Sequence, residues 1–335
     1  MKILLSGATG FIGKDLLQEL QREHTVHTIS RGGQGTYKGD LSLWLGGLPV
    51  EKISQEKYDV FVHAAGLYDL RADSTDLHLA NVTALSTALA LCQKSKITRF
   101  VNLSSIAAGI NSPVGICKPY DLYLEKAFPD YYAESKAQGE KVLINFPEGP
   151  ELRLNLRLGA IVGDTLGNRI QRIDGPYHAP FAMRKAKFLI EKIPTALYLP
   201  GSEDSFLPIV PVDVIAKAIK NFVEYIVSQQ RESYESYNLT PKVGLSLGTL
   251  YRDSLKKQAI ANRGIKLSGL IPDVVTQKIS SWIVDFPEQE LAYVFKLPKY
   301  NSETTSDVLG DRWCPEYFEY EEAFWSGYEK HISNS

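Results

Sequence analysis

A tyrosine and a lysine four positions apart, Tyr132 and Lys136, are the residues of this sequence best placed to move a proton. On a helix, positions four apart lie on one face, so the phenol and the ammonium address the same small volume. A free tyrosine has a pKa of ~10, and a nearby cation favours the phenolate and lowers that pKa. Upstream, Ser104 and Ser105 end an apolar segment and offer a hydroxyl that can hold a carbonyl oxygen.

The Tyr-x-x-x-Lys spacing on its own also fits an amphipathic helix with a packed tyrosine and an exposed lysine. Tyr131 is a second candidate for the packed residue, although only Tyr132 is followed by a lysine four positions later. The order along the chain favours catalysis, because a glycine-rich loop precedes the Ser-Ser pair and the tyrosine helix follows it.

Three glycines, Gly7, Gly10 and Gly13, lie in the segment Gly-Ala-Thr-Gly-Phe-Ile-Gly. The segment follows an apolar strand, Lys2 to Ser6, and opens a helix that leads to a second strand, Thr25 to Ser30. Glycines at such a turn allow close approach to a pyrophosphate, and the helix N-terminus supplies donors and positive potential. The pattern therefore favours a dinucleotide site over a plain strand-to-helix turn.

The second strand ends in Ser30-Arg31, where an NAD-binding sequence carries an acidic residue for the ribose 2′-hydroxyl. A hydroxyl beside a guanidinium suits a 2′-phosphate instead, so NADP(H) is the predicted cofactor. The alternative is that Arg31 is a solvated loop residue. Asp40 follows in a position suited to the adenine.

Further apolar segments indicate strands at Asp59 to His63, Arg99 to Ser104 and Leu152 to Leu158. A helical stretch from about Asp76 to Lys94 separates the first two of these strands. Strands that alternate with helices predict an α/β fold, a Rossmann-type doubly wound parallel sheet. We therefore expect a nucleotide-binding domain over residues 1–160, to which residues 205–240 return.

A smaller C-terminal substrate lobe is expected over residues 161–204 and 241–335. Two of its segments suit a lipophilic ligand: Ala182 to Lys192 and Ile265 to Val284. In the first segment, one apolar face (Ala182, Met183, Ala186, Leu189, Ile190 and Ile193) could line a pocket while Arg184, Lys185, Lys187 and Lys192 meet phosphates. The alternatives are an ordinary amphipathic surface helix and a core segment, respectively.

The composition excludes several classes of protein. A net charge of -2 provides no overall field that would attract nucleic acid. Cys92, Cys117 and Cys314 have neither disulfide nor metal-ligand spacing, so a reducing cytoplasm is expected and no metal is predicted. No run approaches the ~18 apolar residues of a membrane span, and no signal peptide is recognisable.

These motifs together resemble the extended short-chain dehydrogenases/reductases. The resemblance is carried by Gly-Ala-Thr-Gly-Phe-Ile-Gly, Asp59-Val-Phe-Val-His-Ala-Ala-Gly66, Asn81-Val, Leu103-Ser-Ser105, Tyr132 to Lys136, and Leu156-Arg-Leu-Gly159. It implies Ser105, Tyr132 and Lys136 as catalytic residues, with Ser104 as the alternative serine. It also implies a cofactor site of Gly7, Thr9, Gly10, Phe11, Ile12, Gly13, Ser30, Arg31, Asp40, Leu41, Ala64, Ala65, Gly66, Asn81, Lys136, Gly159, Ala160, Ile161 and Val162.

Other segments resemble the fatty acyl-CoA and thioester reductase branch of this family. They are Ala64-Ala-Gly-Leu-Tyr-Asp-Leu-Arg-Ala-Asp73, Ser104-Ser-Ile-Ala-Ala108, Arg172-Ile-Asp-Gly-Pro-Tyr177, Ile209-Val-Pro-Val-Asp213 and Phe324-Trp-Ser-Gly-Tyr-Glu-Lys-His331. The resemblance implies hydride transfer from NADPH to an acyl thioester or a fatty aldehyde, and a possible homodimer. One departure is Leu158-Gly159, where many relatives have proline.

The expected function is thus an NADP(H)-dependent reduction of a lipophilic carbonyl. Two alternatives within the superfamily are a ketone- or steroid-type reductase and a nucleotide-sugar epimerase or dehydratase. A third alternative is a non-catalytic NADP(H)-sensing protein, which would have no need of the Ser105, Tyr132 and Lys136 set.

Overall fold

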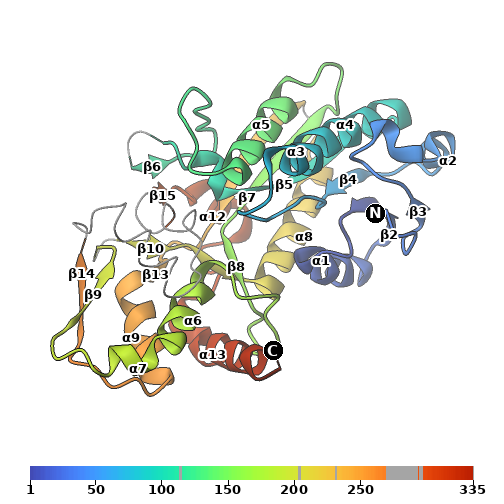
Figure 1. Ribbon diagram of the computed structural model, residues 1–335. Coiled ribbons are helices and arrows are strands. Elements are labelled where there is room, and N and C mark those ends of the chain that lie inside the picture. The colour runs from blue at the N-terminus through green and yellow to red at the C-terminus, as the bar shows by residue number, and fades with distance from the viewer. Residues whose placement is uncertain (113–114, 203–204, 231, 269–292, 294–296, 335) are drawn as a thin grey trace. The chain divides into compact units, whose positions relative to one another are not determined.

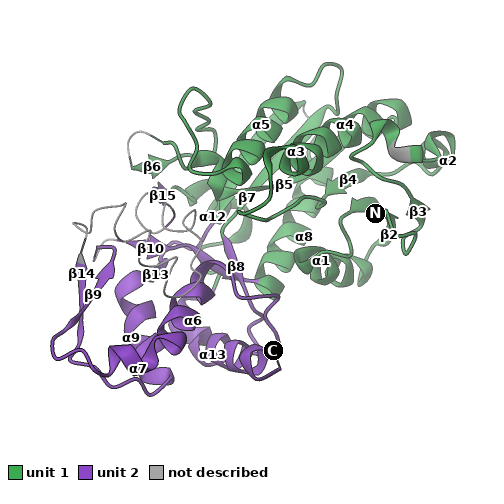
Figure 2. Ribbon diagram, in the orientation of Figure 1, with its two compact units in different colours: residues 1–159, 212–239, 300–314 green, residues 160–211, 240–299, 315–335 purple. Residues whose placement is uncertain are grey.

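The protein is described from a computed structural model that covers residues 1–112, 115–202, 205–230, 232–268, 293 and 297–334. Its chain divides into two compact units (Figure 2). Unit 1 comprises residues 1–159, 212–239 and 300–314, and unit 2 comprises residues 160–211, 240–299 and 315–335.

Unit 1 is built on a parallel sheet of seven strands, in the order β12-β7-β5-β4-β1-β2-β3. The strands are β1 (Lys2–Ser6), β2 (Thr25–Ser30), β3 (Tyr37–Lys38), β4 (Val60–His63), β5 (Arg99–Ser105), β7 (Leu152–Leu158) and β12 (Ser233–Leu239). The direction of chain progression reverses between β1 and β4, which lie side by side with Ser6 opposite His63. This switch point is where doubly wound sheets bind ligands, and the predicted fold class is confirmed.

Helices cover both faces of this sheet (Figure 1). On one face, α1 (Phe11–Gln21) packs against α8 (Val212–Ser228), whose buried residues recur at helical spacing. The other face carries α2 (Val50–Gln55), α3 (Ser74–His78), a π-helical turn (Leu79–Thr83), α4 (Ala84–Ser95) and α5 (Tyr131–Asn145). The core on that side joins Leu4, Phe61 and Phe100 of the strands to Leu85 and Leu89 of α4.

Further short elements of unit 1 include β6 (Ile116–Cys117), which pairs with β15 (Lys299–Tyr300), two 3-10 helices (Trp44–Gly47 and Ile106–Gly109) and α12 (Glu303–Leu309). Helix α12 is tied to β12, because the Thr305 hydroxyl donates to the Asn238 carbonyl over 2.8 Å.

The described part of unit 2 combines short strand pairs with helices. The pairs are β8 (Ala160–Val162) with β11 (Ile209–Pro211), β9 (Leu197–Pro200) with β14 (Ile265–Ser268), and β10 (Phe206–Leu207) with β13 (Leu245–Ser246). The helices are α6 (His178–Lys185), α7 (Lys187–Ile190), α9 (Leu247–Lys257) and α13 (Tyr317–Asn334). Stacked aromatic rings of Tyr177, Phe324 and Tyr328 fill one core cluster of this unit.

The unit boundaries differ from the expected ones in two places. Residues 205–211 belong to unit 2 rather than to the nucleotide-binding domain, because β11 pairs with β8. Residues 300–314 belong to unit 1 rather than to the C-terminal lobe, because α12 packs on β12 and α8. Hydrogen bonds between segments distant in the sequence decide both assignments.

Candidate active site

The glycine-rich segment forms the turn from β1 into α1, at the switch point of the sheet. Gly7 has a φ of +80°, and a Cβ there would lie 2.4 Å from backbone atoms of Ala64 and Ala65. A Cβ on Gly13 would lie 2.0 Å from the Gly7 carbonyl oxygen. Gly10 caps α1 without a side chain, and the first turn of the helix contains no acidic residue. This bare, positively polarised helix end fits the pyrophosphate of a dinucleotide.

The remaining residues of the loop surround that helix end. Thr9 and Gly10 are exposed, and Phe11 and Ile12 are half-buried in the first turn of α1. The Gly10 N–H donates to the Gly7 carbonyl over 3.0 Å, so the N–H groups of Phe11 and Ile12, in the first turn of the helix, are the ones that would meet a ligand here.

Two cationic residues lie near the end of β2: Arg31, which follows the strand, and Lys38 of the neighbouring strand β3. Ser30 lies opposite Lys38 of β3 in the sheet register, and its hydroxyl accepts from the Gln34 backbone N–H over 3.0 Å. Arg31 and Lys38 are both exposed, and neither side chain has a hydrogen-bond or ion-pair partner in the described parts of the chain. Lys38 was missed by sequence reasoning, since a strand of two residues leaves no periodic pattern.

Asp40 and Leu41 follow this strand but are engaged within the protein. The Asp40 carboxylate accepts from the Ser42 backbone N–H over 2.9 Å and from its hydroxyl over 2.7 Å. The Leu41 side chain is buried in the core cluster of unit 1, beside Tyr37. Any contact of Leu41 with an adenine would therefore come from its backbone.

The segment after β4 is held against α5 by Asn81. Its amide nitrogen donates to the Leu67 carbonyl and to the Ser135 hydroxyl, each over 3.0 Å, and its amide oxygen accepts from the Leu67 N–H over 2.9 Å. A Cβ on Gly66 would lie 2.9 Å from that oxygen and 3.1 Å from the Lys136 Nζ. Asn81 sits in the π-helical turn, a local irregularity that often marks functional sites.

Ser105 and Tyr132 meet at the carboxyl end of β5. Ser105 is the last residue of the strand, and Tyr132 lies in the first turn of α5, which Asp130 caps over 2.8 Å. The Ser105 hydroxyl accepts from the Ala107 N–H over 3.2 Å, and it is close enough to the Tyr132 phenol to lower the pKa of that group. The Tyr68 ring packs edge-to-face on the Tyr132 ring with centroids 5.0 Å apart.

The structure distinguishes Tyr132 from Tyr131 and Ser105 from Ser104. Tyr131 is 57% exposed and Tyr132 is 7% exposed, so the alternative that Tyr131 is the packed residue is wrong. Ser104 faces the other side of β5, where its hydroxyl donates to Glu140 over 2.6 Å. Of the two serines, Ser105 is therefore the one whose hydroxyl affects the pKa of Tyr132.

Lys136 lies one helical turn beyond Tyr132 and is half-buried. Its Nζ donates to the Leu103 carbonyl over 3.4 Å and lies 6.0 Å from the centre of the Tyr132 ring. Burial lowers the pKa of Lys136 to about 8, although the Glu140 carboxylate acts in the opposite direction.

The predicted lowering of the tyrosine pKa is wrong for this structure. Burial raises the pKa of Tyr132 to about 12, against the smaller opposing effect of the Ser105 hydroxyl. Desolvation of the phenolate therefore dominates the pKa of this tyrosine. Tyr132 is protonated at neutral pH, which is the form that can donate a proton.

Beneath these residues lies a buried ion pair that sequence reasoning missed. Arg157 of β7 and Glu140 of α5 are each 1% exposed. The guanidinium meets the carboxylate in three contacts of 2.6 to 3.1 Å and also donates to the carbonyls of Asp121, over 2.7 Å, and Lys118, over 3.2 Å. Glu140 outweighs the opposing effect of burial and raises the pKa of Arg157. The network joins the lysine-bearing helix to the segment after β6.

The sequence contains a signal that could have indicated this pair, because Arg157 lies within the apolar run Leu152 to Leu158 and a buried cation requires a partner. Glu140, four positions after Lys136 on the same helix face, was the available carboxylate.

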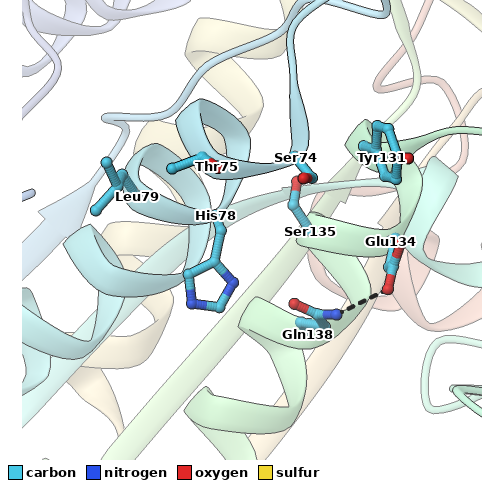
Figure 3. Close-up of a pocket in the computed structure, with 8 residues that line it drawn as sticks. All are labelled: Ser74, Thr75, His78, Leu79, Tyr131, Glu134, Ser135 and Gln138. Carbon is cyan, nitrogen blue, oxygen red and sulfur yellow. Dashed lines mark hydrogen bonds between the residues drawn. The ribbon is translucent and has the colours of Figure 1, made fainter.

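A separate pocket of about 510 Å³ opens between α3 and α5 (Figure 3). Figure 3 shows Tyr131, Glu134 and Gln138 along α5, with the Gln138 amide donating to Glu134 over 3.0 Å. The remaining lining residues are Ser74, Thr75, His78, Leu79 and Ser135. None of Ser105, Tyr132 and Lys136 lines this pocket, so it is distinct from the catalytic candidates.

The last predicted cofactor residues are divided between the units. Gly159 ends the unit 1 part, with its N–H donating to the Leu239 carbonyl over 3.1 Å. Ala160, Ile161 and Val162 form β8 of unit 2, where the Val162 side chain is buried in the core.

The predicted apolar face over Ala182 to Lys192 forms in part, and its buried residues belong to the core of unit 2. Met183 and Ile190 are buried against α9, whereas Leu189 is 55% exposed. Of the segment Ile265 to Val284, residues 269–284 lie outside the described residues, and Ile265 and Leu267 pack against the same cluster as Met183.

The described residues contain neither a candidate metal site nor a candidate membrane span. No group of three or more His, Cys, Asp or Glu side chains is placed to hold a metal ion. No helix there combines the length and the hydropathy needed to cross a bilayer.

Solved structures with similar folds include reductases and epimerases. The terminal R domain of the myxalamid biosynthetic pathway aligns with a TM-score of 0.73 at 18% identity, over 99% of this chain and 90% of that one. A thiolation-reductase di-domain from an archaeal non-ribosomal peptide synthetase aligns with a TM-score of 0.71 at 16% identity, over 100% and 76%. UDP-glucuronic acid 4-epimerase from Bacillus cereus, in complex with NAD, aligns with a TM-score of 0.67 at 17% identity, over 99% of both chains.

A curated relative from Stigmatella aurantiaca is a 4-hydroxy-2-methyl-3-oxo-4-farnesyl-3,4-dihydroquinoline-1-oxide ketoreductase. It is 29% identical over 117 residues, and the match covers 32% of this chain and about a third (34%) of that protein. A family model described as "Male sterility protein", for an NAD-binding domain, matches residues 34–219, more than half of the chain. With the seven-stranded parallel sheet and the sequence motifs, this match shows that the chain belongs to the male sterility protein family, within the extended short-chain dehydrogenase/reductase type of oxidoreductase.

Proposed function

We propose that this protein is an NADP(H)-dependent reductase of a lipophilic carbonyl compound, either a fatty aldehyde or an acyl thioester. The observation that carries the proposal is the placement of Ser105, Tyr132 and Lys136: Ser105 ends β5, the buried Tyr132 lies in the first turn of α5, and half-buried Lys136 lies one turn further along α5. This group lies at the carboxyl end of the same sheet whose switch point carries the bare helix end at Gly10.

In this proposal, the Ser105 hydroxyl donates to the carbonyl oxygen and stabilises the charge that develops on it. A bound reduced nicotinamide would supply the hydride. Tyr132, protonated at neutral pH because its pKa is about 12, transfers its proton to the same oxygen. Lys136 binds the nicotinamide ribose and stabilises the phenolate that Tyr132 becomes. With a thioester, the resulting hemithioacetal would collapse to an aldehyde and a free thiol.

The choice of NADP(H) rests on the end of β2. Arg31 and Lys38 project there without partners in the described part of the chain, next to the Ser30 hydroxyl. Two cations favour a 2′-phosphate, and the carboxylate that holds a ribose 2′-hydroxyl in NAD-binding proteins is missing from this strand end.

The lipophilic substrate is supported by the relatives. The ketoreductase from Stigmatella aurantiaca has a farnesyl group in the name of its substrate. The R-domain neighbours support the fold alone. The same ketoreductase favours a ketone substrate as the second candidate function.

We also propose a cytoplasmic location and a homodimeric state for the protein. The three cysteines are free thiols, which suits a reducing cytoplasm. Leu79, Tyr131 and Ile144 are exposed on the outer side of the α3 to α5 layer, and they are the residues through which we expect a homodimer to form.

The test is NADPH oxidation measured against acyl-CoAs, aldehydes and ketones of graded chain length. Each buried methylene contributes ~0.8 kcal/mol, so kcat/KM is expected to rise about fourfold for each added methylene until the pocket is filled. A response that is flat in chain length would contradict a lipophilic pocket. Turnover confined to ketones would favour the ketone reductase, and NAD released on denaturation would favour an epimerase. Binding of NADPH without turnover of any substrate would favour a sensor.

A further inference from the structure

The outer side of α7 exposes two large apolar side chains on one helical turn. Phe188 is 67% exposed and Leu189 is 55% exposed. The inner side of the same turn already supplies the core of unit 2, where Ile190 is 6% exposed and packs in one cluster with Met183 and Tyr251. Burial in the core therefore requires neither Phe188 nor Leu189, and neighbouring exposed apolar side chains of this kind mark interaction surfaces.

Cations surround this apolar pair. Residues 184–192 contain four basic residues and one acidic residue, a net charge of +3, whereas the whole chain has a net charge of -2. Arg184 is paired with Glu329 over 2.8 Å, and Lys187 donates to the Gln258 carbonyl over 3.3 Å. Lys185 and Lys192 lie at either end of the turn. The surface is thus locally basic in a protein that is slightly acidic.

Lys185 and Lys192, which flank the apolar pair, each lie beside an aromatic ring. The Lys192 Nζ is 3.7 Å from the centre of the Phe188 ring, and the Lys185 Nζ is 4.5 Å from the centre of the Phe181 ring. The same arrangement recurs on the β9–β14 pair, where the Lys266 Nζ is 5.7 Å from the ring centre of Tyr198, which is 58% exposed. Strands β9 and β14 pack on the same core cluster as α7. An ammonium held beside an exposed ring suits the boundary between a polar and an apolar layer.

We infer that the α7 surface docks on a membrane that contains anionic phospholipids. Phe188 and Leu189 would enter the acyl region while Lys185 and Lys192 stay among the headgroup phosphates. A folded acidic protein would instead have to remove water from the lysines that flank the pair, which is costly for charged groups. A headgroup layer leaves these lysines hydrated, and this difference favours the lipid surface. The inference does not depend on which reaction the protein catalyses.

The test is co-sedimentation of the full chain with vesicles of phosphatidylcholine alone or mixed with phosphatidylglycerol. We expect binding to the mixed vesicles, weaker binding at high salt, and little binding to phosphatidylcholine. The double substitution F188S/L189S should weaken binding by at least about tenfold. Since a lysine near an anionic surface contributes about a fivefold factor, K185E/K192E should weaken binding by about 25-fold or more.

The matched control is Phe318→Ser on α13 of the same unit. Phe318 is 69% exposed and lies between Glu316 and Glu319 in the sequence, so its removal should leave vesicle binding unchanged. Two measurements on the same preparations separate a loss of docking from a loss of folding or activity. They are far-UV circular dichroism and the oxidation of NADPH during reduction of a short water-soluble aldehyde.

Binding that is equal in the parent protein and in F188S/L189S would overturn the inference, as would the lack of binding to either vesicle. Binding to an acidic acyl carrier protein, abolished by the same substitutions and without any vesicle binding, would assign the surface to a protein partner and would equally overturn the lipid assignment.

Discussion

Removal of the Glu140 carboxylate should destabilise unit 1 strongly. Arg157 and Glu140 are each 1% exposed and meet in contacts of 2.6 to 3.1 Å. In Glu140→Leu the guanidinium would stay buried with neutral partners, the carbonyls of Lys118 and Asp121 and the Cys117 Sγ. Leaving one charge of a buried pair uncompensated costs about 3–5 kcal/mol. The single substitution Arg157→Met should lower the free energy of unfolding by a similar amount, because it leaves the Glu140 carboxylate buried without its cation.

The double substitution E140L/R157M should cost far less than the sum of the two single ones. It leaves no buried charge, and its main loss is two donors to part-buried carbonyls, about 1–3 kcal/mol each before water replaces them. Chemical denaturation followed by far-UV circular dichroism measures these differences as shifts of the midpoint at constant slope. The exposed neighbour Lys141→Leu is the control, with an expected change within about 0.5 kcal/mol.

The reasoning would be refuted by a cost below about 1 kcal/mol for Glu140→Leu, or by a double substitution whose cost equals the sum of the single ones. Either result would mean that Glu140 and Arg157 do not form the buried pair described here.

Three further outcomes are expected. A charged hydrogen bond contributes about 1.5–3 kcal/mol, so Arg31→Ala and Lys38→Ala should each weaken NADPH binding by about 10- to 150-fold and leave NADH binding unchanged. Fluorescence titration measures both affinities. An equal loss for both nucleotides would contradict the 2′-phosphate assignment. Lys136, whose pKa burial lowers to about 8, is cationic below that pH and neutral above it, so kcat/KM for NADPH should fall as the pH rises through about 8. A profile that is flat from pH 6 to 10 would argue against this role. Burial raises the pKa of Cys117 to about 11, so the native protein should not be alkylated at Cys117 by iodoacetamide, as peptide mass mapping would show.

The parts of the site that lie within one helix or strand were predictable. The spacing of Tyr132 and Lys136 placed them on one helix face, and the glycine pattern located the turn between β1 and α1. The reason is local: helical periodicity and the missing glycine side chains are visible in a few consecutive residues.

Contacts between distant segments were not predictable in the same way. The Ser104 hydroxyl lies 36 positions from Glu140, and Ser30 meets Lys38 only because β3 pairs with β2. The direction of the Tyr132 pKa shift was also out of reach, because it depends on how completely the fold removes the phenol from water. Sequence spacing shows which groups can meet, while burial determines their protonation.

The most direct test of the account is the substitution Tyr132→Phe, with NADPH binding and carbonyl turnover measured on the same preparation. The substitution removes only the phenol hydroxyl and keeps the ring that packs on Tyr68. The account predicts NADPH affinity close to that of the parent protein and the loss of nearly all turnover, about 100-fold or more for a general acid. Turnover within about twofold of the parent protein would contradict the assignment of Tyr132 as the proton donor.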